Sequence, residues 1–231
     1  MEGRSPLDRL RAVEPAPQDD KPAMPKRRGP KVDLELTRQR REDILREAAN
    51  LFEQVGYHGV NMEMIAEAAG LKKPTLYHYV KGKDEILFLM QRAVIVGVRE
   101  GIEARIARGQ PPLELLQGVY EDIFRQLRDA PGTVRSFFEH GRELTAEQQS
   151  EIGRERNAFT RVVARVIFRG MESGAINRAD PRLMALCFFG VVNWAYQWYD
   201  PLRDGEPETI ASKCFEIFCQ GMAPAASASA G

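Results

Sequence analysis

The stretch from Asn61 to Lys83, NMEMIAEAAGLKKPTLYHYVKGK, constrains the fold more than any other part of the chain. It predicts two short helices joined by a sharp turn. Asn61 is suited to cap the first helix through its side-chain oxygen, and Gly70 can end that helix because glycine adopts a positive φ at little cost. Pro74 fits the first turn of the second helix, where a missing N–H is tolerated. These signals indicate a helix-turn-helix.

The second helix of this stretch is expected to present polar side chains to a partner. Leu76 and Val80, at positions i and i+4, can hold it against the rest of the protein, so the residues between them point elsewhere. An anchored short helix that presents Lys, Thr, Tyr and His is how a helix-turn-helix reads the major groove of DNA. We therefore predict that Lys73, Thr75 and His78 reach the edges of bases.

The distribution of charge supports a DNA partner, although the net charge of the whole chain is zero. Residues 21–83 contain 13 Lys and Arg against 8 Asp and Glu, so the positive excess lies on the segment with the helix-turn-helix, as contact with phosphate requires. The basic run Lys26, Arg27, Arg28 and Lys31 directly precedes this domain. It is predicted to lie as an extended arm in the minor groove or along phosphates, the alternative being a solvated run of charges.

The run from Thr37 to about Leu89 resembles the DNA-binding domain of the TetR/AcrR family of bacterial transcription regulators. The matching pieces are ILREAANLFEQVGYHGVNM, IAEAAG and TLYHYVKGKDEIL, in this order and spacing. The resemblance implies that Tyr77, Tyr79 and Lys83 contact the DNA backbone. Lys72 stands where the family usually has a Ser or Thr that caps the recognition helix, and we include it among the expected DNA contacts.

The rest of the chain has a helical pattern throughout, without the alternation that is typical of strands. We therefore predict an all-α protein, in which a three-helix helix-turn-helix domain is joined to an α-helical ligand-binding and dimerisation domain. The expected divisions are a disordered tail with the basic arm (1–32), the DNA-binding domain (33–83), the effector-binding and dimerisation domain (84–222) and a second disordered tail (223–231).

The segment 181–199 is predicted to be one helix that is apolar nearly all round. Such a helix must be buried on more than one side, against its own core and against a partner chain, and Cys187 is expected to be buried with it. The resemblance implies the same arrangement, because family members dimerise through a four-helix bundle. Helices near 157–173 and 181–199 are expected to form it. A homodimer also suits a two-fold DNA site with two half-sites at fixed spacing.

The block NWAYQWYDP at 193–201 is similar to a pattern in TetR-family regulators of fatty-acid, steroid and acyl-CoA catabolism. This resemblance implies an acyl-CoA thioester as the effector that releases the protein from DNA. Relatives of this kind often carry Arg at the position of Gln197. Core and interface aromatics are the alternative interpretation of the block, and a drug-like or aromatic effector is the alternative ligand. The candidate effector contacts are Tyr120, Phe124, Phe137, Phe138, His140, Arg142, Phe159, Trp194, Gln197 and Trp198, because an effector site is usually a large apolar pocket with few polar groups.

The sequence lacks the motifs of common enzymes, namely a Gly-rich phosphate loop, GxSxG, HExxH and CxxC,. Its three histidines and three cysteines form neither a metal-binding nor a disulfide pattern, so no cofactor, metal or catalytic residue is expected. The N-terminus lacks the apolar segment of a signal peptide, and the apolar stretches are shorter than the ~20 residues of a spanning helix. These features predict a cytoplasmic protein without membrane contact.

These observations predict a homodimeric repressor that binds double-stranded operator DNA and is released by a small apolar effector. An activator would share this sequence. A helical interaction protein that does not bind DNA and a small all-α enzyme are the alternatives from other classes, and a thiol redox sensor is a further one.

Overall fold

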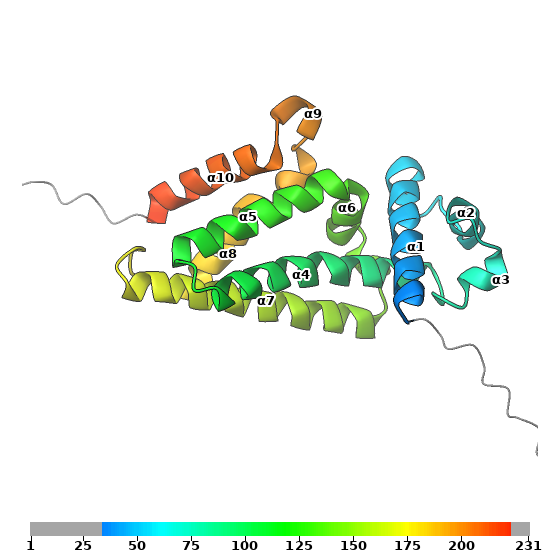
Figure 1. Ribbon diagram of the computed structural model, residues 1–231, viewed down its shortest axis with the longest axis horizontal. Coiled ribbons are helices and arrows are strands. Elements are labelled where there is room, and N and C mark those ends of the chain that lie inside the picture. Colours follow the sequence, from blue (N-terminus) through cyan, green and yellow to red (C-terminus); the bar gives the residue numbers. More distant parts are fainter. Residues whose placement is uncertain (1–33, 223–231) are drawn as a thin grey trace, which may run out of the picture. The chain divides into compact units, whose positions relative to one another are not determined.

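The computed structural model describes residues 34–222. The basic arm (Lys26, Arg27, Arg28 and Lys31) and the segments 1–32 and 223–231 lie outside this range. Within it the protein is helical and has no strand, which confirms the all-α prediction, and residues 34–222 belong to one compact unit (Figure 1). The helices are α1 (Leu34–Val55), α2 (Met62–Ala68), α3 (Lys73–Leu76), α4 (Lys83–Ala107), α5 (Pro112–Asp129), α6 (Pro131–Glu139), α7 (Ala146–Glu172), α8 (Pro181–Asn193), α9 (Pro201–Asp204) and α10 (Pro207–Met222), with 3-10 turns η2 (Gly141–Glu143) and η3 (Ala195–Gln197).

The first three helices form the segment that we call the head. The Asn61 side chain caps α2 as predicted, because its Oδ1 accepts the backbone N–H groups of Glu63 and Met64 at 2.9 and 3.0 Å. Gly70 follows α2 with a φ of +64°, as expected. Helix α3 is a short helix of four residues, and a turn continues it to Val80. The buried side chains of Leu76 and Val80 anchor this element to the head.

Helix α6 approaches the head more closely than an ordinary side chain would allow. A Cβ atom added to Gly132, in its first turn, would lie 2.6 Å from the carbonyl oxygen of Ala49 in α1. Glycine is therefore required at this position by the close approach of two backbones. Further along α6, the backbone oxygen of the buried Ser136 accepts the side-chain amide of the buried Gln91 from α4 at 3.3 Å.

Helix α7 starts with a capping box formed by Thr145 and Gln148. The N–H of Gln148 donates to Thr145 Oγ1 at 3.2 Å and the N–H of Thr145 donates to Gln148 Oε1 at 2.9 Å, which satisfies donors that a helix start leaves free. The helix then runs for 27 residues without a break. It packs on α4 and α8, so the expected helix at 157–173 is the second half of a longer one.

The expected helix at 181–199 was predicted too long. Helix α8 ends at Asn193, and the chain continues through η3. Pro201 disfavours the α conformation only at Asp200, the residue before it; the helix ends earlier, where η3 packs on α6. The Asp200 side chain instead caps α9 by accepting the Leu202 N–H at 2.9 Å. Tyr196 turns back to stack on Phe138 of α6, with ring centroids 4.6 Å apart.

Tyr120 of α5 lies in the core beneath α8. Its ring is fully buried and its hydroxyl donates to the backbone oxygen of Phe188 at 2.9 Å. Burial raises the pKa of this phenol above its ordinary value, because the charged form is poorly solvated in the core.

Tyr120→Phe is expected to lower the free energy of unfolding by about 1 kcal/mol near pH 7.5, since one buried hydrogen bond is lost. The folded pKa is raised, so the contribution of the phenol is fully present below about pH 10, the pKa of an unfolded tyrosine, and is lost as the pH rises further. The difference between wild type and variant should therefore narrow above pH ~10. Urea unfolding at several pH values measures it, and a constant difference would contradict the role of the phenol.

Candidate DNA-reading surface and effector cavity

The outer side of α3 and its following turn presents polar side chains to solvent. Lys73, Tyr77 and His78 are exposed, with 47% of Tyr77 accessible, and Thr75 is partly buried. Lys73 Nζ lies 3.7 Å from Glu63 Oε2, an exposed pair that contributes little to stability. The structure therefore brings the expected base-reading side chains together on one short anchored element, which is the arrangement that a major-groove reader needs.

Two further residues flank this reading surface. Tyr79 is partly buried, and its backbone oxygen accepts the guanidinium of Arg41 from α1 at 3.3 Å. Lys72 is exposed and makes no side-chain cap to α3. Arg41 was not among the sequence-predicted contacts, because only the packing of α1 against the reading helix shows that it lies beside Tyr79.

Lys83 has a structural role in the protein without DNA. Its Nζ donates to the backbone oxygens of Tyr57 and Val60, both at 2.8 Å, and lies 4.4 Å from the centre of the Tyr57 ring. Partial burial lowers the pKa of this ammonium, while the nearby Glu143 raises it. Lys83 thus ties the start of α4 to the loop before α2, and its contact with the DNA backbone stays a prediction.

A cavity of about 220 Å³ lies among α4, α5, α6, α7 and α8, and we call it the effector cavity. Phe137, Phe138 and Phe159 of the expected effector contacts line it. Sequence reasoning missed other lining residues, among them Val94, Ile123, Arg156, Thr160, Phe189 and Asn193. Of these, Asn193 belongs to the NWAYQWYDP block, and Thr160 and Phe189 lie on the helices that the sequence assigned to the dimer interface.

The other expected effector contacts lie elsewhere. Tyr120 and Phe124 are fully buried core residues. His140 stacks on Tyr57 of the head, with ring centroids 5.1 Å apart, because α6 ends beside the loop before α2. The remaining four are exposed and do not line the effector cavity: Arg142, Trp194, Gln197 and Trp198.

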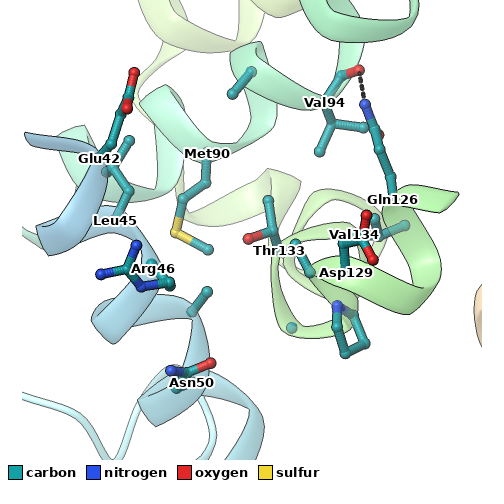
Figure 2. A pocket seen from close by; sticks show the side chains of 15 residues that line it. Glu42, Leu45, Arg46, Asn50, Met90, Val94, Gln126, Asp129, Thr133 and Val134 are labelled. Atoms are coloured by element: carbon teal, nitrogen blue, oxygen red, sulfur yellow. Dashed lines mark hydrogen bonds between the residues drawn. The ribbon is translucent and has the colours of Figure 1, made fainter. Parts of the chain in front are cut away.

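A second hollow of about 370 Å³ lies between α1, α4 and the junction of α5 with α6, and we call it the head groove. Figure 2 shows Met90 between the α1 side chains and Thr133. Val94, Gln126 and Val134 line both this groove and the effector cavity. The amide of Gln126 donates to the backbone oxygen of Val94 at 3.3 Å (Figure 2), which joins α5 to α4 at this shared wall.

One side of α7 and α8 carries apolar side chains that solvent reaches. The exposed fractions of Leu183 and Trp194 are 59% and 63%. Cys187 on α8 is also exposed, so the expectation that it is buried is wrong for the single chain. We call this the apolar face, and its members are Phe168, Leu183, Leu186, Cys187, Val191 and Trp194. A patch of this kind is typical of a surface that another protein covers.

Comparison with known proteins agrees with this arrangement. Residues 44–90 match the family model of bacterial regulatory proteins of the tetR family, and residues 109–222 match the tetracyclin repressor-like C-terminal domain. The regulator YhgD of Bacillus subtilis (strain 168) is 24% identical over 176 residues, which cover 74% of this chain and 91% of YhgD. The repressor KstR2 of Rhodococcus jostii (strain RHA1) is 23% identical over 186 residues, which cover 80% and 91% of the two chains.

Solved structures share the fold. The crystal structure of AibR in complex with isovaleryl coenzyme A and operator DNA superimposes with a TM-score of 0.67 at 26% identity, covering 77% of this chain and 97% of AibR. In the described part of the chain, no helix combines the length and apolarity needed to cross a membrane. The matching families consist of regulators and not of enzymes, in agreement with the prediction. With its N-terminal helix-turn-helix and its helical C-terminal part, this chain belongs to the TetR family of transcriptional regulators.

Proposed function

We propose that this protein is a homodimeric repressor that an effector releases from operator DNA in the cytoplasm. The observation that carries the proposal is the reading surface itself. Lys73, Tyr77 and His78 are exposed on an element whose other side is fixed by the buried Leu76 and Val80. Anchorage on one side and polar exposure on the other let a short helix enter a major groove in a defined orientation. The basic arm, outside the described residues, would add contacts to phosphates or the minor groove.

The apolar face on α7 and α8 supports the homodimer. Two copies related by a two-fold axis bury the same patch on each other, which would cover Leu183 and Trp194 and place two reading surfaces at a fixed distance. An operator with two half-sites then binds both heads of one dimer. The expected helices at 157–173 and 181–199 contain this face, with the second one ending at Asn193.

The effector cavity supports ligand control. Its aromatic and aliphatic lining, with few polar groups, is the common form of a small-molecule site. AibR, a relative with the same fold, has been crystallised with isovaleryl coenzyme A and operator DNA. We therefore favour an acyl-CoA thioester as the effector of this protein, with a drug-like or aromatic compound as the second candidate.

The contacts of α6 indicate how a ligand in the effector cavity would affect DNA binding by the head. Val134, Phe137 and Phe138 on this helix line the effector cavity, while Gly132 at its start touches the backbone of α1. A ligand that binds better to a conformation with a shifted α6 would shift the population toward a head spacing that no longer fits two successive major grooves.

The direct test is fluorescence anisotropy on DNA from upstream of the gene for this protein, with a scrambled duplex as control, near 150 mM salt. Binding to the upstream duplex alone, and its loss with one member of an acyl-CoA panel, is the expected result. Specific binding that no acyl-CoA affects would keep the regulator and remove this effector class. Equal and weak binding to both duplexes, and to further candidate operators, would contradict the DNA-binding proposal.

Lys73→Ala is expected to lower operator affinity about tenfold per head, since a base-edge contact is worth roughly 1–3 kcal/mol. Binding to the scrambled duplex should change much less, because non-specific binding depends on phosphate contacts. Lys213→Ala, which removes an exposed lysine from α10, is the matched control and should change neither affinity. An equal loss on both duplexes would make Lys73 a phosphate contact, and no loss would exclude it from the interface.

A further inference from the structure

Arg156 of α7 is a cation without an acidic partner at the wall of the effector cavity. In the described part of the chain no carboxylate lies within ion-pair distance of it, and its guanidinium lies 5.8 Å from the centre of the Phe137 ring. The two acids that precede Arg156 most closely along α7 are already engaged. Glu151 pairs with Arg92 of α4 and Glu155 pairs with Arg99 of α4, both at 3.6 Å. The positive charge of Arg156 is therefore left available at the cavity.

Another cavity, distinct from the head groove, adjoins the effector cavity at Arg156, and we call it the second cavity. It has a volume of about 420 Å³ and shares Phe137, Phe138 and Arg156 with the effector cavity. Its own lining is more polar, with the side chains of Gln91 and Gln149. Arg156 and the two phenylalanines thus stand between an apolar compartment and a polar one.

We propose that the effector is an amphipathic anion whose charged group binds Arg156, an assignment that rests on the proposed ligand-controlled function. Its apolar part would occupy the effector cavity against Phe159 and Phe189, and any polar extension would enter the second cavity. A guanidinium offers paired N–H donors that match the oxygens of a carboxylate, sulfonate or phosphate. A free carboxylic acid and the phosphate-bearing arm of a CoA thioester share this chemistry.

A matched pair of fluorescent probes tests the charge requirement on the whole protein without DNA. 8-Anilinonaphthalene-1-sulfonate carries the anion, and N-phenyl-1-naphthylamine is the same ring system without it. We expect wild type to bind the sulfonate more tightly, at one site per chain. Arg156→Gln should weaken the sulfonate about tenfold, the loss of one charge-assisted hydrogen bond, and leave the neutral amine unchanged.

Arg154→Gln is the control for the loss of one positive charge from α7. Arg154 is exposed, does not line either cavity, and donates to Ser150 Oγ at 3.1 Å. It should leave the binding of both probes unchanged. Equal binding of the two probes to wild type, an unchanged sulfonate affinity in Arg156→Gln, or equal losses of both probes would overturn the proposal.

Displacement of the sulfonate distinguishes the two sources of the anion. Octanoate or octanoyl-CoA should displace it, and octan-1-ol should not, so displacement by the alcohol at equal concentration would overturn the anion requirement. Gly153 lines the second cavity, and a Cβ there meets no atom within 4 Å. Gly153→Phe adds its first carbon without a clash and should place its ring in this cavity, which weakens octanoyl-CoA and spares octanoate; unchanged octanoyl-CoA binding in a variant with wild-type helicity would overturn the placement of the extension.

Operator binding separates this inference from the proposed function. Arg156→Gln should bind operator DNA like wild type and respond to the anion only at about tenfold higher concentration. Operator release by neutral compounds alone would overturn the anion proposal and keep the repressor. Charge-dependent probe binding in a protein with no operator affinity would keep the anion proposal and overturn the proposed repressor.

Discussion

Leu183→Glu is expected to convert the proposed dimer into monomers and to lower operator affinity by roughly 100-fold or more. Leu183 is 59% exposed on the apolar face of α8, where two copies of the chain are proposed to meet. A two-fold interface would bury the new carboxylate twice, each time without a partner, and an unpaired buried charge is strongly destabilising. Operator affinity falls with it, because two linked heads bind far more tightly than one.

Light scattering coupled to size exclusion gives the mass of the variant, and anisotropy on the operator gives its affinity. Ile217→Glu is the matched control, since Ile217 is 71% exposed on α10 and lies outside the apolar face. It should leave both the mass and the affinity unchanged. A dimeric Leu183→Glu protein with full operator binding would show that the chain associates through another surface.

Gly132→Val is expected to lower the free energy of unfolding by about 1–3 kcal/mol, the usual cost of forcing extra atoms into packed structure. The added Cβ would lie 2.6 Å from the backbone oxygen of Ala49, and a backbone atom cannot move aside as a long side chain can. Helix α6 must therefore shift away from α1. Because α6 also lines the effector cavity, the same variant should alter effector affinity and operator affinity together.

Gly153→Ala provides the comparison for this substitution, since it adds the same first carbon atom where no atom lies within 4 Å. Gly153→Ala should leave the free energy of unfolding unchanged or raise it by up to about 1 kcal/mol, because glycine is unfavourable within a helix. Urea unfolding of the two variants beside wild type measures the difference. An equal free energy of unfolding for Gly132→Val and wild type would mean that α6 can move away from α1 without loss of stability.

Local signals made much of the fold predictable. The Asn61 cap and the Thr145 capping box each depend on residues within three positions of one another, so the sequence contains everything that specifies them. The positive φ at Gly70 is equally local. The end of α8 is different, because Asn193 stops the helix where Tyr196 stacks on a distant phenylalanine of α6. Helical periodicity cannot report such a contact.

The candidate effector site was harder to predict for the same reason. Phe124 and Phe137 are both aromatic residues on amphipathic helices, yet one is sealed in the core and the other lines a cavity. Only the packing of neighbouring helices decides between the two. In the sequence, Arg156 is one of several arginines of α7. Only the structure shows that it lies near Phe137 of α6 at the wall of the effector cavity. The burial of Cys187 was predicted from an apolar segment, while the single chain leaves it exposed.

The shared wall of the effector cavity and the head groove couples the space available on its two sides. Val94, Gln126 and Val134 border both compartments, so a displacement of this wall toward one compartment would take room from it and give room to the other. Thermodynamic linkage is reciprocal. A compound that fills the head groove would therefore weaken effector binding by the same factor by which the effector weakens binding of that compound. Under the proposed function, such a compound would act as an anti-inducer that keeps the protein on DNA without contacting the effector.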